Sequence, residues 1–196
     1  PKTGHNILHH SNIRPFSVSP IMWHIVFNCM ATRLGNFLLE HALLHPAQAA
    51  FLSEGNIDDA IDTLLSTWED AHRHKIKTCK TPRNISGNGN VTLFHDIAKA
   101  YDCIRWSSIK HSLARLKLPP AFIELVLNSL QGSSACVRTA YGLTKSFPVD
   151  KAIKQGCPTA PLLFIIVMDP LHTGYPEHGG YTYYSGHKVS SAGYAD

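Results

Sequence analysis

The chain of 196 residues has few charged side chains, no CxxC pair, no long apolar run and no apolar leader. Charged residues make up 16%, against about a quarter in typical soluble domains, which indicates a surface partly covered by further chain. The longest uninterrupted apolar run, residues 162–168, is too short to span a bilayer. Residues 1–10 lack Met and any signal-like segment, so secretion has no support. The five cysteines, odd in number, fit a reducing compartment. We therefore expect an intracellular protein without a membrane span, in the cytoplasm, the nucleus or both.

What is present is typical of a globular chain. Hydrophobic residues make up 44%, which excludes disorder as the main state, and this length forms one domain or two small ones. Histidine is frequent, with 13 residues, and His41 and His45 have the spacing of two helical metal ligands. Pro46 ends any helix there, so scattered surface histidines are the better interpretation.

The hydrophobic pattern predicts an α+β fold with an internal boundary near residue 84. Before it, residues 20–44 and 57–72 have helical periodicity, and a basic stretch followed by ISGNGN indicates a loop. After it, we predict a strand over 91–97, a helix over 107–118 capped by Ser107 or Ser108, and a second helix over 121–130. Two strands around a turn, a helix starting at Pro158 or Pro161, and short terminal strands complete the prediction.

Two aspartates follow predicted strands and form a candidate metal site. Asp96 comes after VTLF, and Asp196 comes after SSAGYA. A buried carboxylate is costly alone but not beside a divalent cation. Two carboxylates brought side by side at strand ends suit a Mg²⁺ site for phosphoryl transfer. The alternative is that both are ordinary strand-end aspartates.

Five ordered blocks of the chain resemble those of reverse transcriptases, and the closest type is that of non-LTR, LINE-type retrotransposons. DIAKAYDCI (96–104) resembles the pattern D-x-x-x-A-[FY]-D, KQGCPTAPLLF (154–164) resembles R-Q-G-x-P-x-S-P-x-x-F, and YAD (194–196) resembles the first letters of Y-A-D-D. Upstream, NIRPFSV (12–18) resembles N-x-R-P-I-S, and residues 45–61 resemble H-P-x-Q-x-G-F-x-x-G-R-x-x-x-D-x-I. The blocks together cover nearly the whole chain.

The resemblance implies a role for each matching residue. Asp96 and Asp196 would be the catalytic, metal-binding carboxylates, with the backbone carbonyl of Ile97 completing the site for Mg²⁺ or Mn²⁺. Tyr101 would be the aromatic gate that excludes a ribose 2′-hydroxyl, although it could be only a core aromatic. Gln155 and Gly156 would lie beside the incoming nucleotide and the template base. Lys154 and Arg14 would contact nucleic acid or phosphate, with a structural ion pair as the alternative for Arg14. Asp102 matches the second Asp of its block, which is generally structural.

Several positions depart from the family pattern. Asn56 stands where an arginine meets the triphosphate, Ala50 replaces a glycine, and Ala160 replaces a serine. Lys154 stands where the family has Arg, which keeps the charge but loses the bidentate fork. The sequence ends one residue before the second Asp of Y-A-D-D. We therefore expect a fragment without the thumb, inactive by itself.

The resemblance implies a polymerase right-hand fold, with helical fingers over 1–84 and a palm with an antiparallel sheet over 85–196, truncated inside the third catalytic motif. It implies RNA-directed DNA synthesis by two-metal nucleotidyl transfer, with template RNA, a DNA primer and deoxynucleoside triphosphates as partners. Residues 99–154 carry nine Lys/Arg against three acids, which suits a phosphate backbone. The alternatives are a non-catalytic nucleic-acid-binding remnant and, third, an RNA-dependent RNA polymerase, against which Tyr101 and YAD argue. The sequence does not indicate an oligomeric state.

Overall fold

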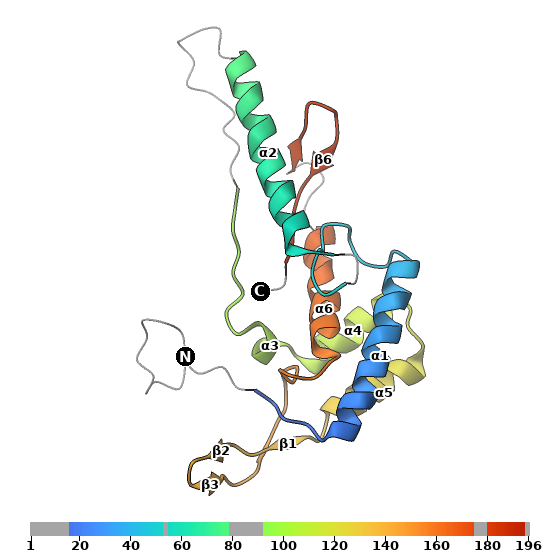
Figure 1. Cartoon of the computed structure of the whole chain (residues 1–196). Helices are drawn as coiled ribbons and strands as arrows, with labels where there is room; N and C mark the ends of the chain where they lie inside the picture. Colours follow the sequence, from blue (N-terminus) through green and yellow to red (C-terminus); the bar gives the residue numbers. More distant parts are fainter. Residues whose placement is uncertain (1–15, 53–54, 79–91, 175–179, 195–196) are drawn as a thin grey trace. The chain divides into compact units, whose positions relative to one another are not determined.

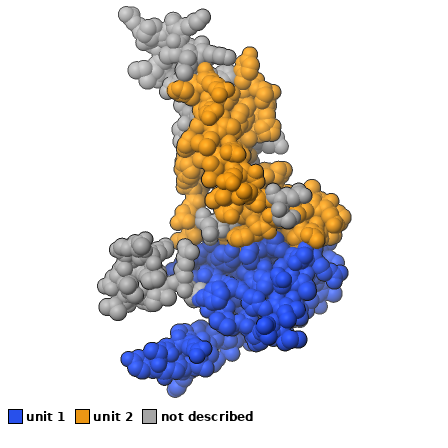
Figure 2. Space-filling model, in the orientation of Figure 1, with its two compact units in different colours: residues 1–34, 99–163 blue, residues 35–98, 164–196 orange. Residues whose placement is uncertain are grey.

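The computed structural model of the chain describes residues 16–52, 55–78, 92–174 and 180–194, with only the backbone for 74–78 (Figure 1). Helices and short antiparallel strand pairs make up these residues, so the predicted mixture of helix and strand is confirmed. The chain divides into two compact units, residues 1–34 with 99–163 (unit 1) and residues 35–98 with 164–196 (unit 2) (Figure 2). Each unit combines two stretches far apart in sequence. The predicted division at 84/85 falls outside the described residues and stays a prediction.

Unit 1 is mostly helical. It contains the first part of α1 (Ile21–Glu40), α3 (Ala100–Cys103), α4 (Trp106–Arg115) and α5 (Pro120–Leu130). The helices predicted over 20–44, 107–118 and 121–130 are confirmed, with ends that differ by a few residues. The predicted serine cap is wrong, because α4 begins at Trp106 after an extended Arg105 that makes no side-chain cap. The Trp106 Nε1–H instead donates to the carbonyl oxygen of Ala152 at 3.0 Å, which fixes the start of the helix.

The core of unit 1 lies where α4 packs on α5. The side chains of Ile109 and Leu113 in α4 are completely buried, and α5 buries its residues at helical spacing: Ile123, Val126, Leu127 and Leu130. Burying one such side chain stabilises a fold by about 1.5–3 kcal/mol. Pro120 occupies the first turn of α5, where its missing N–H costs no hydrogen bond. The packed pair of α4 and α5 therefore forms the hydrophobic core of unit 1.

The strands of unit 1 form two short antiparallel pairs. β1 (Ser134–Ala135) pairs with β4 (Phe147–Pro148), and β2 (Arg138–Thr139) pairs with β3 (Gly142–Leu143). The two predicted strands around a turn are thus present in shortened form, the first as the separate strands β1 and β2 and the second as β4 alone. The antiparallel sheet expected for a palm is represented among the described residues by two-stranded pairs only.

Unit 2 contains α2 (Ile57–Thr78), the end of α1, most of α6 (Ala160–Gly174), and the antiparallel pair of β5 (Tyr181–Thr182) and β6 (Lys188–Val189). The predicted helix over 57–72 and the helix after Pro158 are confirmed. The Tyr181 hydroxyl donates to the Asp70 carboxylate at 2.8 Å, and the Tyr183 hydroxyl lies 2.7 Å from that of Thr67. These bonds fix the β5–β6 hairpin to α2.

The strand predicted over 91–97 is wrong for the residues described, 92–97. No described residue pairs with this segment, and Leu93 and Phe94 are about three-quarters exposed. The segment instead contacts α2 through side chains: Trp68 Nε1–H donates to Thr92 Oγ1 at 2.9 Å, and the Trp68 and Phe94 rings meet edge to face. An apolar run becomes a strand only where a neighbouring strand takes its backbone hydrogen bonds.

Among the helices that the structure describes, none combines the length and apolar character that crossing a membrane requires.

Candidate functional site

Three of the five sequence blocks meet in unit 1. The Ser17 N–H, from the block at 12–18, donates to the carbonyl oxygen of Gln155 at 2.8 Å. The N–H groups of Ala152 and Ile153, just before the block at 154–164, donate to the carbonyl oxygens of Ile104 and Tyr101, both at 2.9 Å. The loop at 152–156 is therefore held on one side by the first block and on the other by the block at 96–104.

The backbone of Gly156 lies very close to the first block. Its φ is +99°, and a Cβ atom there would lie 2.8 Å from the Ser17 carbonyl oxygen and 2.9 Å from the Phe16 ring. Only glycine adopts this backbone without strain and leaves room for these neighbours. In unit 1 the neighbours of Gly156 are Phe16 and Ser17, from the block at 12–18. Its place beside a nucleotide or template base stays a prediction.

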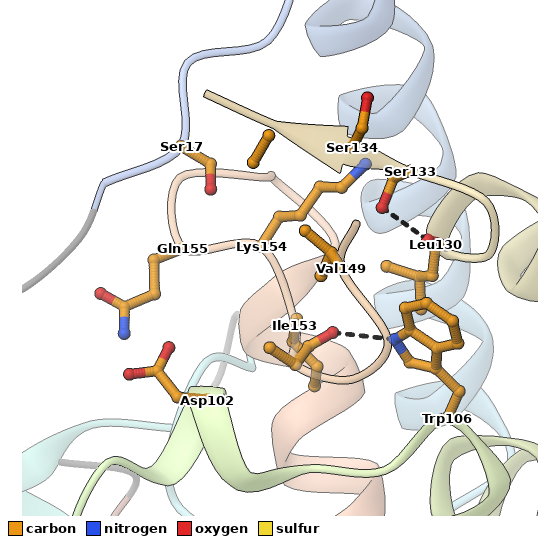
Figure 3. A pocket seen from close by; sticks show the side chains of 12 residues that line it. Ser17, Asp102, Trp106, Leu130, Ser133, Ser134, Val149, Ile153, Lys154 and Gln155 are labelled. Carbon is orange, nitrogen blue, oxygen red and sulfur yellow. Dashed lines mark hydrogen bonds between the residues drawn. The ribbon is translucent and has the colours of Figure 1, made fainter. Parts of the chain in front are cut away.

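A hollow of about 110 Å³ opens beside this loop, lined by polar groups that include Ser17, Asp102, Lys154 and Gln155 (Figure 3). The Gln155 amide and the Asp102 carboxylate point toward one another at one end of it. On another side lie Ser134 and Val149, from β1 and the residue after β4. Small-molecule pockets usually measure about 300–1,000 Å³, so this hollow is too small to enclose a whole ligand of that kind.

The sequence-predicted residues Tyr101 and Lys154 also lie at this loop. Tyr101 is in α3, is half-buried, and accepts the Ile153 N–H with its backbone carbonyl. The ammonium group of Lys154 donates to the carbonyl oxygen of Ser129 at 3.3 Å, near the C-terminal end of α5. A helix C-terminus favours a nearby cation, so this lysine has a structural contact besides its predicted contact with phosphate.

Two more blocks meet in unit 2. The segment at 45–51 runs parallel to residues 191–194: Gly193 N–H donates to Ala47 O at 2.8 Å, and Ala49 N–H donates to Gly193 O at 3.1 Å. The rings of Phe51 and Tyr194 stack, with centroids 6.4 Å apart. The chain leading to YAD is thus fixed against the block at 45–61.

Two residues of α6 that the sequence interpretation missed hold these segments. Asp169 is 1% exposed and accepts the His45 N–H at 2.6 Å. His172 stacks on His45 and shares a hydrogen bond of 3.1 Å with Ser191. Burial, together with the nearby His45, lowers the pKa of His172 below its usual value. The signal for Asp169 was present: an acid inside the apolar run LLFIIVMDPL needs a partner when the helix is buried.

The predicted metal ligands are described only in part. Asp96 and Ile97 lie in unit 2 with exposed side chains, and no hydrogen bond joins the Asp96 carboxylate to a residue that the structure describes. Asp196 and Arg14 lie outside the described residues. Within the described ranges, no three His, Cys, Asp or Glu side chains gather as metal ligands do. A free carboxylate and a backbone carbonyl are the hard oxygen donors that Mg²⁺ takes, so Asp96 and Ile97 fit the ion in chemistry.

Asn56 marks the main departure from the family pattern, and the structure gives it a local role. Its backbone N–H donates to Asp59 at 2.8 Å and its side-chain amide donates to Asp58 at 3.0 Å, both in the first turn of α2. The residue before a helix and an acid three positions later commonly satisfy free N–H groups in this way. Asn56 is therefore bound to the start of α2.

Charge is distributed unevenly between the units. The described residues of unit 1 carry ten Lys/Arg against three Asp/Glu, whereas those of unit 2 carry four against eight. A domain with a strong excess of positive charge attracts phosphate backbones. The positive charge expected for a nucleic-acid surface is thus in unit 1.

The sequence blocks that meet beside the hollow and the positive charge of unit 1 are features expected of the polymerase class that the sequence motifs resemble, and the comparisons with known proteins agree. Residues 1–196 match the family described as "Reverse transcriptase (RNA-dependent DNA polymerase)". The chain belongs to the reverse transcriptase family.

The similar curated proteins are polyproteins of R2 elements. The chain is 30% identical over 174 residues to the "Retrovirus-related Pol polyprotein from type-1 retrotransposable element R2" of Popillia japonica, covering 87% of this chain and 22% of that protein. It is 27% identical to the R2 polyprotein of Nasonia vitripennis and to the R2DM polyprotein of Drosophila melanogaster, covering 86% of this chain each time. The chain spans 14–22% of the length of these relatives. The predicted resemblance to non-LTR retrotransposon reverse transcriptases is confirmed.

Proposed function

We propose that the chain forms the fingers and palm of an RNA-directed DNA polymerase, with template RNA, a DNA primer and deoxynucleoside triphosphates as its ligands. The observation that carries the proposal is the meeting of three sequence blocks at the loop 152–156 in the basic unit 1. A polymerase site needs residues from separate blocks to converge on one nucleotide, because catalysis depends on positioning and electrostatic stabilisation.

In this proposal the polar groups around the hollow position the nucleotide. The Gln155 amide offers a donor and an acceptor to a base or sugar, and the Gly156 backbone leaves room for Phe16 and Ser17. Tyr101 packs its ring where a ribose 2′-hydroxyl would stand, so deoxynucleotides are accepted and ribonucleotides clash. Lys154 adds a positive charge for phosphate.

The acids hold the metal. Asp96, the carbonyl group of Ile97 and Asp196 would bind Mg²⁺ or Mn²⁺. A bound metal of this kind would lower the pKa of the primer 3′-hydroxyl and stabilise the leaving pyrophosphate. In the transfer, the 3′-oxygen forms a bond to the α-phosphorus of the nucleotide, the bond to pyrophosphate breaks, and the hydroxyl proton is lost. The exposed Asp96 carboxylate is accessible for this role.

A second candidate is a non-catalytic remnant that only binds nucleic acid. Asn56 favours it, because the side chain at the position expected to meet the triphosphate is uncharged and bonded to Asp58. Losing one interaction that stabilises the transition state commonly costs a hundredfold or more in rate. The basic unit 1 would still bind nucleic acid in a salt-sensitive way.

Primer extension separates the two candidates. We would assay the 196-residue chain, and the longest open reading frame that contains it, on an RNA template with a DNA primer and Mg²⁺ or Mn²⁺. The polymerase proposal expects template-dependent extension by the longer protein, abolished by Asp96→Ala and kept by Asp62→Ala, an exposed acid of the same unit. Binding of the template without any extension by either protein would support the remnant instead.

A further inference from the structure

The tip of the β2–β3 hairpin in unit 1 presents a fully exposed aromatic side chain. Tyr141, in the turn between the two strands, has a relative exposure of 102%, and its neighbours Val137 and Leu143 are also exposed. Figure 1 shows this hairpin as a projection beyond β1. An aromatic ring left entirely in water contributes little to folding, so the whole ring is accessible to a ligand.

The hairpin is ordered by its own hydrogen bonds. Thr139 pairs with Gly142 across the turn, and the Thr139 hydroxyl donates to Gly142 O at 2.9 Å and accepts the Tyr141 N–H at 3.1 Å. Further down, Thr144 and Val137 exchange bonds of 2.9 and 3.0 Å. A preformed loop loses less conformational freedom when a ligand binds. The Tyr141 ring is therefore carried on a backbone already set for contact.

The charge of the hairpin indicates the kind of ligand. Arg138 and Lys145 are exposed on it, and residues 136–148 contain no Asp or Glu. The other exposed hairpin tyrosine, Tyr184, lies in the acidic unit 2, where its backbone N–H donates to Asp70. An exposed ring between cations is the arrangement by which proteins hold unpaired bases and their phosphates.

We propose that this tip binds single-stranded nucleic acid, with one unpaired base stacked on the Tyr141 ring and the adjacent phosphates near Arg138 and Lys145. The proposal rests on the proposed function, which requires a single-stranded template. The chain that leads into the hairpin starts at the candidate site, because Ala135 of β1 lines the hollow with Lys154 and Gln155. Tyr141 is six positions after Ala135, so the tip lies within about 20 Å of that residue at about 3.3 Å per residue.

The test measures the affinity of the 196-residue chain for a fluorescein-labelled 12-nucleotide RNA of mixed sequence by fluorescence anisotropy. Tyr141→Ala should weaken binding about fivefold or more, since removing an aromatic ring from a stacked base has at least this effect. Tyr141→Trp should keep or strengthen binding because it retains the ring. Tyr184→Ala is the matched control, with a change of less than twofold expected. Both tyrosine side chains are exposed, and circular dichroism would verify that each variant keeps its fold.

The same measurement with other nucleic acids identifies the ligand. Tyr141→Ala should weaken binding of an RNA duplex less than twofold, because paired bases are not available for stacking. An equal loss with single-stranded DNA would support recognition of unpaired bases in general, and a loss with RNA alone would support the proposal and assign RNA as its ligand. RNA binding that is unchanged by Tyr141→Ala would overturn the hairpin site and leave the polymerase proposal intact, with protein contact as the use of the tip. A chain that binds no nucleic acid at low salt would overturn both.

Discussion

Replacing Gly156 by Ala tests whether the first block is packed on the loop of the candidate site. The φ of +99° places this residue in a region that costs a side-chain-bearing residue about 1–2 kcal/mol. The added methyl would also lie 2.8–2.9 Å from Ser17 and Phe16, both nearer than normal van der Waals contact. Overpacking of this kind costs about 1–3 kcal/mol. We therefore expect Gly156→Ala to lower the free energy of unfolding by about 2–5 kcal/mol.

Two other glycines separate the backbone cost from the contact cost. Gly132 has a φ of +67° with nothing within 4 Å of its built Cβ, so Gly132→Ala should lose only about 1 kcal/mol from backbone strain. Gly174 ends α6 without a positive φ and without near neighbours, so Gly174→Ala should be neutral or slightly stabilising. Equilibrium urea unfolding of the chain, followed by circular dichroism at 222 nm, measures all three.

The loss in free energy of unfolding for Gly156→Ala, compared with that for Gly132→Ala, decides the test. A larger loss at Gly156 supports the contact of the loop with Phe16 and Ser17. Equal losses would refute the packing, because the two variants would then pay only for their backbone conformations. Without this contact, the hydrogen bond from the Ser17 N–H to the Gln155 carbonyl oxygen would also be absent.

Three further predictions concern single residues. Tyr101→Ala, in an active protein, should raise the incorporation of ribonucleotides relative to deoxynucleotides; unchanged discrimination would show that Tyr101 only packs. Asn56→Ala should destabilise the chain by about 1 kcal/mol or less, because it removes the side-chain bond to Asp58 and keeps the backbone bond to Asp59; urea unfolding measures this. Asn56→Arg should lower the KM for nucleotide in steady-state kinetics if this position faces the triphosphate. Because the pKa of His172 is lowered on folding, its neutral form should stabilise the fold fully above about pH 6.5 and progressively less as the pH falls toward the folded pKa. His172→Gln should reduce this decline in the urea midpoint between pH 8 and 5. An unchanged decline would contradict the lowered pKa of His172 as its cause.

The helices of this chain could be predicted because their signals are local. The apolar positions of residues 57–72 repeat at helical spacing, and α2 covers Ile57–Thr78. Pro119 and Pro120 predict the break between two helices, which the structure places between Arg115 and Pro120. The beginning of α4 was missed because the bond from Trp106 to Ala152 joins residues 46 positions apart.

The strand pairing and the contacts between distant blocks could not be predicted from local sequence. The run VTLFHDI has the composition of a strand, but whether it pairs depends on a distant partner, and residues 92–97 contact Trp68 of α2 instead. The block motifs led to Gln155 and Gly156 as candidate site residues, which stay predictions, but nothing local indicates that Phe16 and Ser17 pack on them. Asp169 was overlooked because its partner, the His45 N–H, lies 124 residues away in sequence.

The most direct test of the polymerase assignment is the distance between Asp96 and Asp196 in an experimental structure with an RNA template, a DNA primer, a deoxynucleoside triphosphate and Mg²⁺. Two metals in a nucleotidyl-transfer site lie about 3.5–4 Å apart and are bridged by carboxylates. We predict that both side chains converge on one cation, beside the α-phosphate and the primer 3′-hydroxyl. Carboxylates more than about 10 Å apart after any rotamer change, or a metal bound without Asp96, would contradict the assignment.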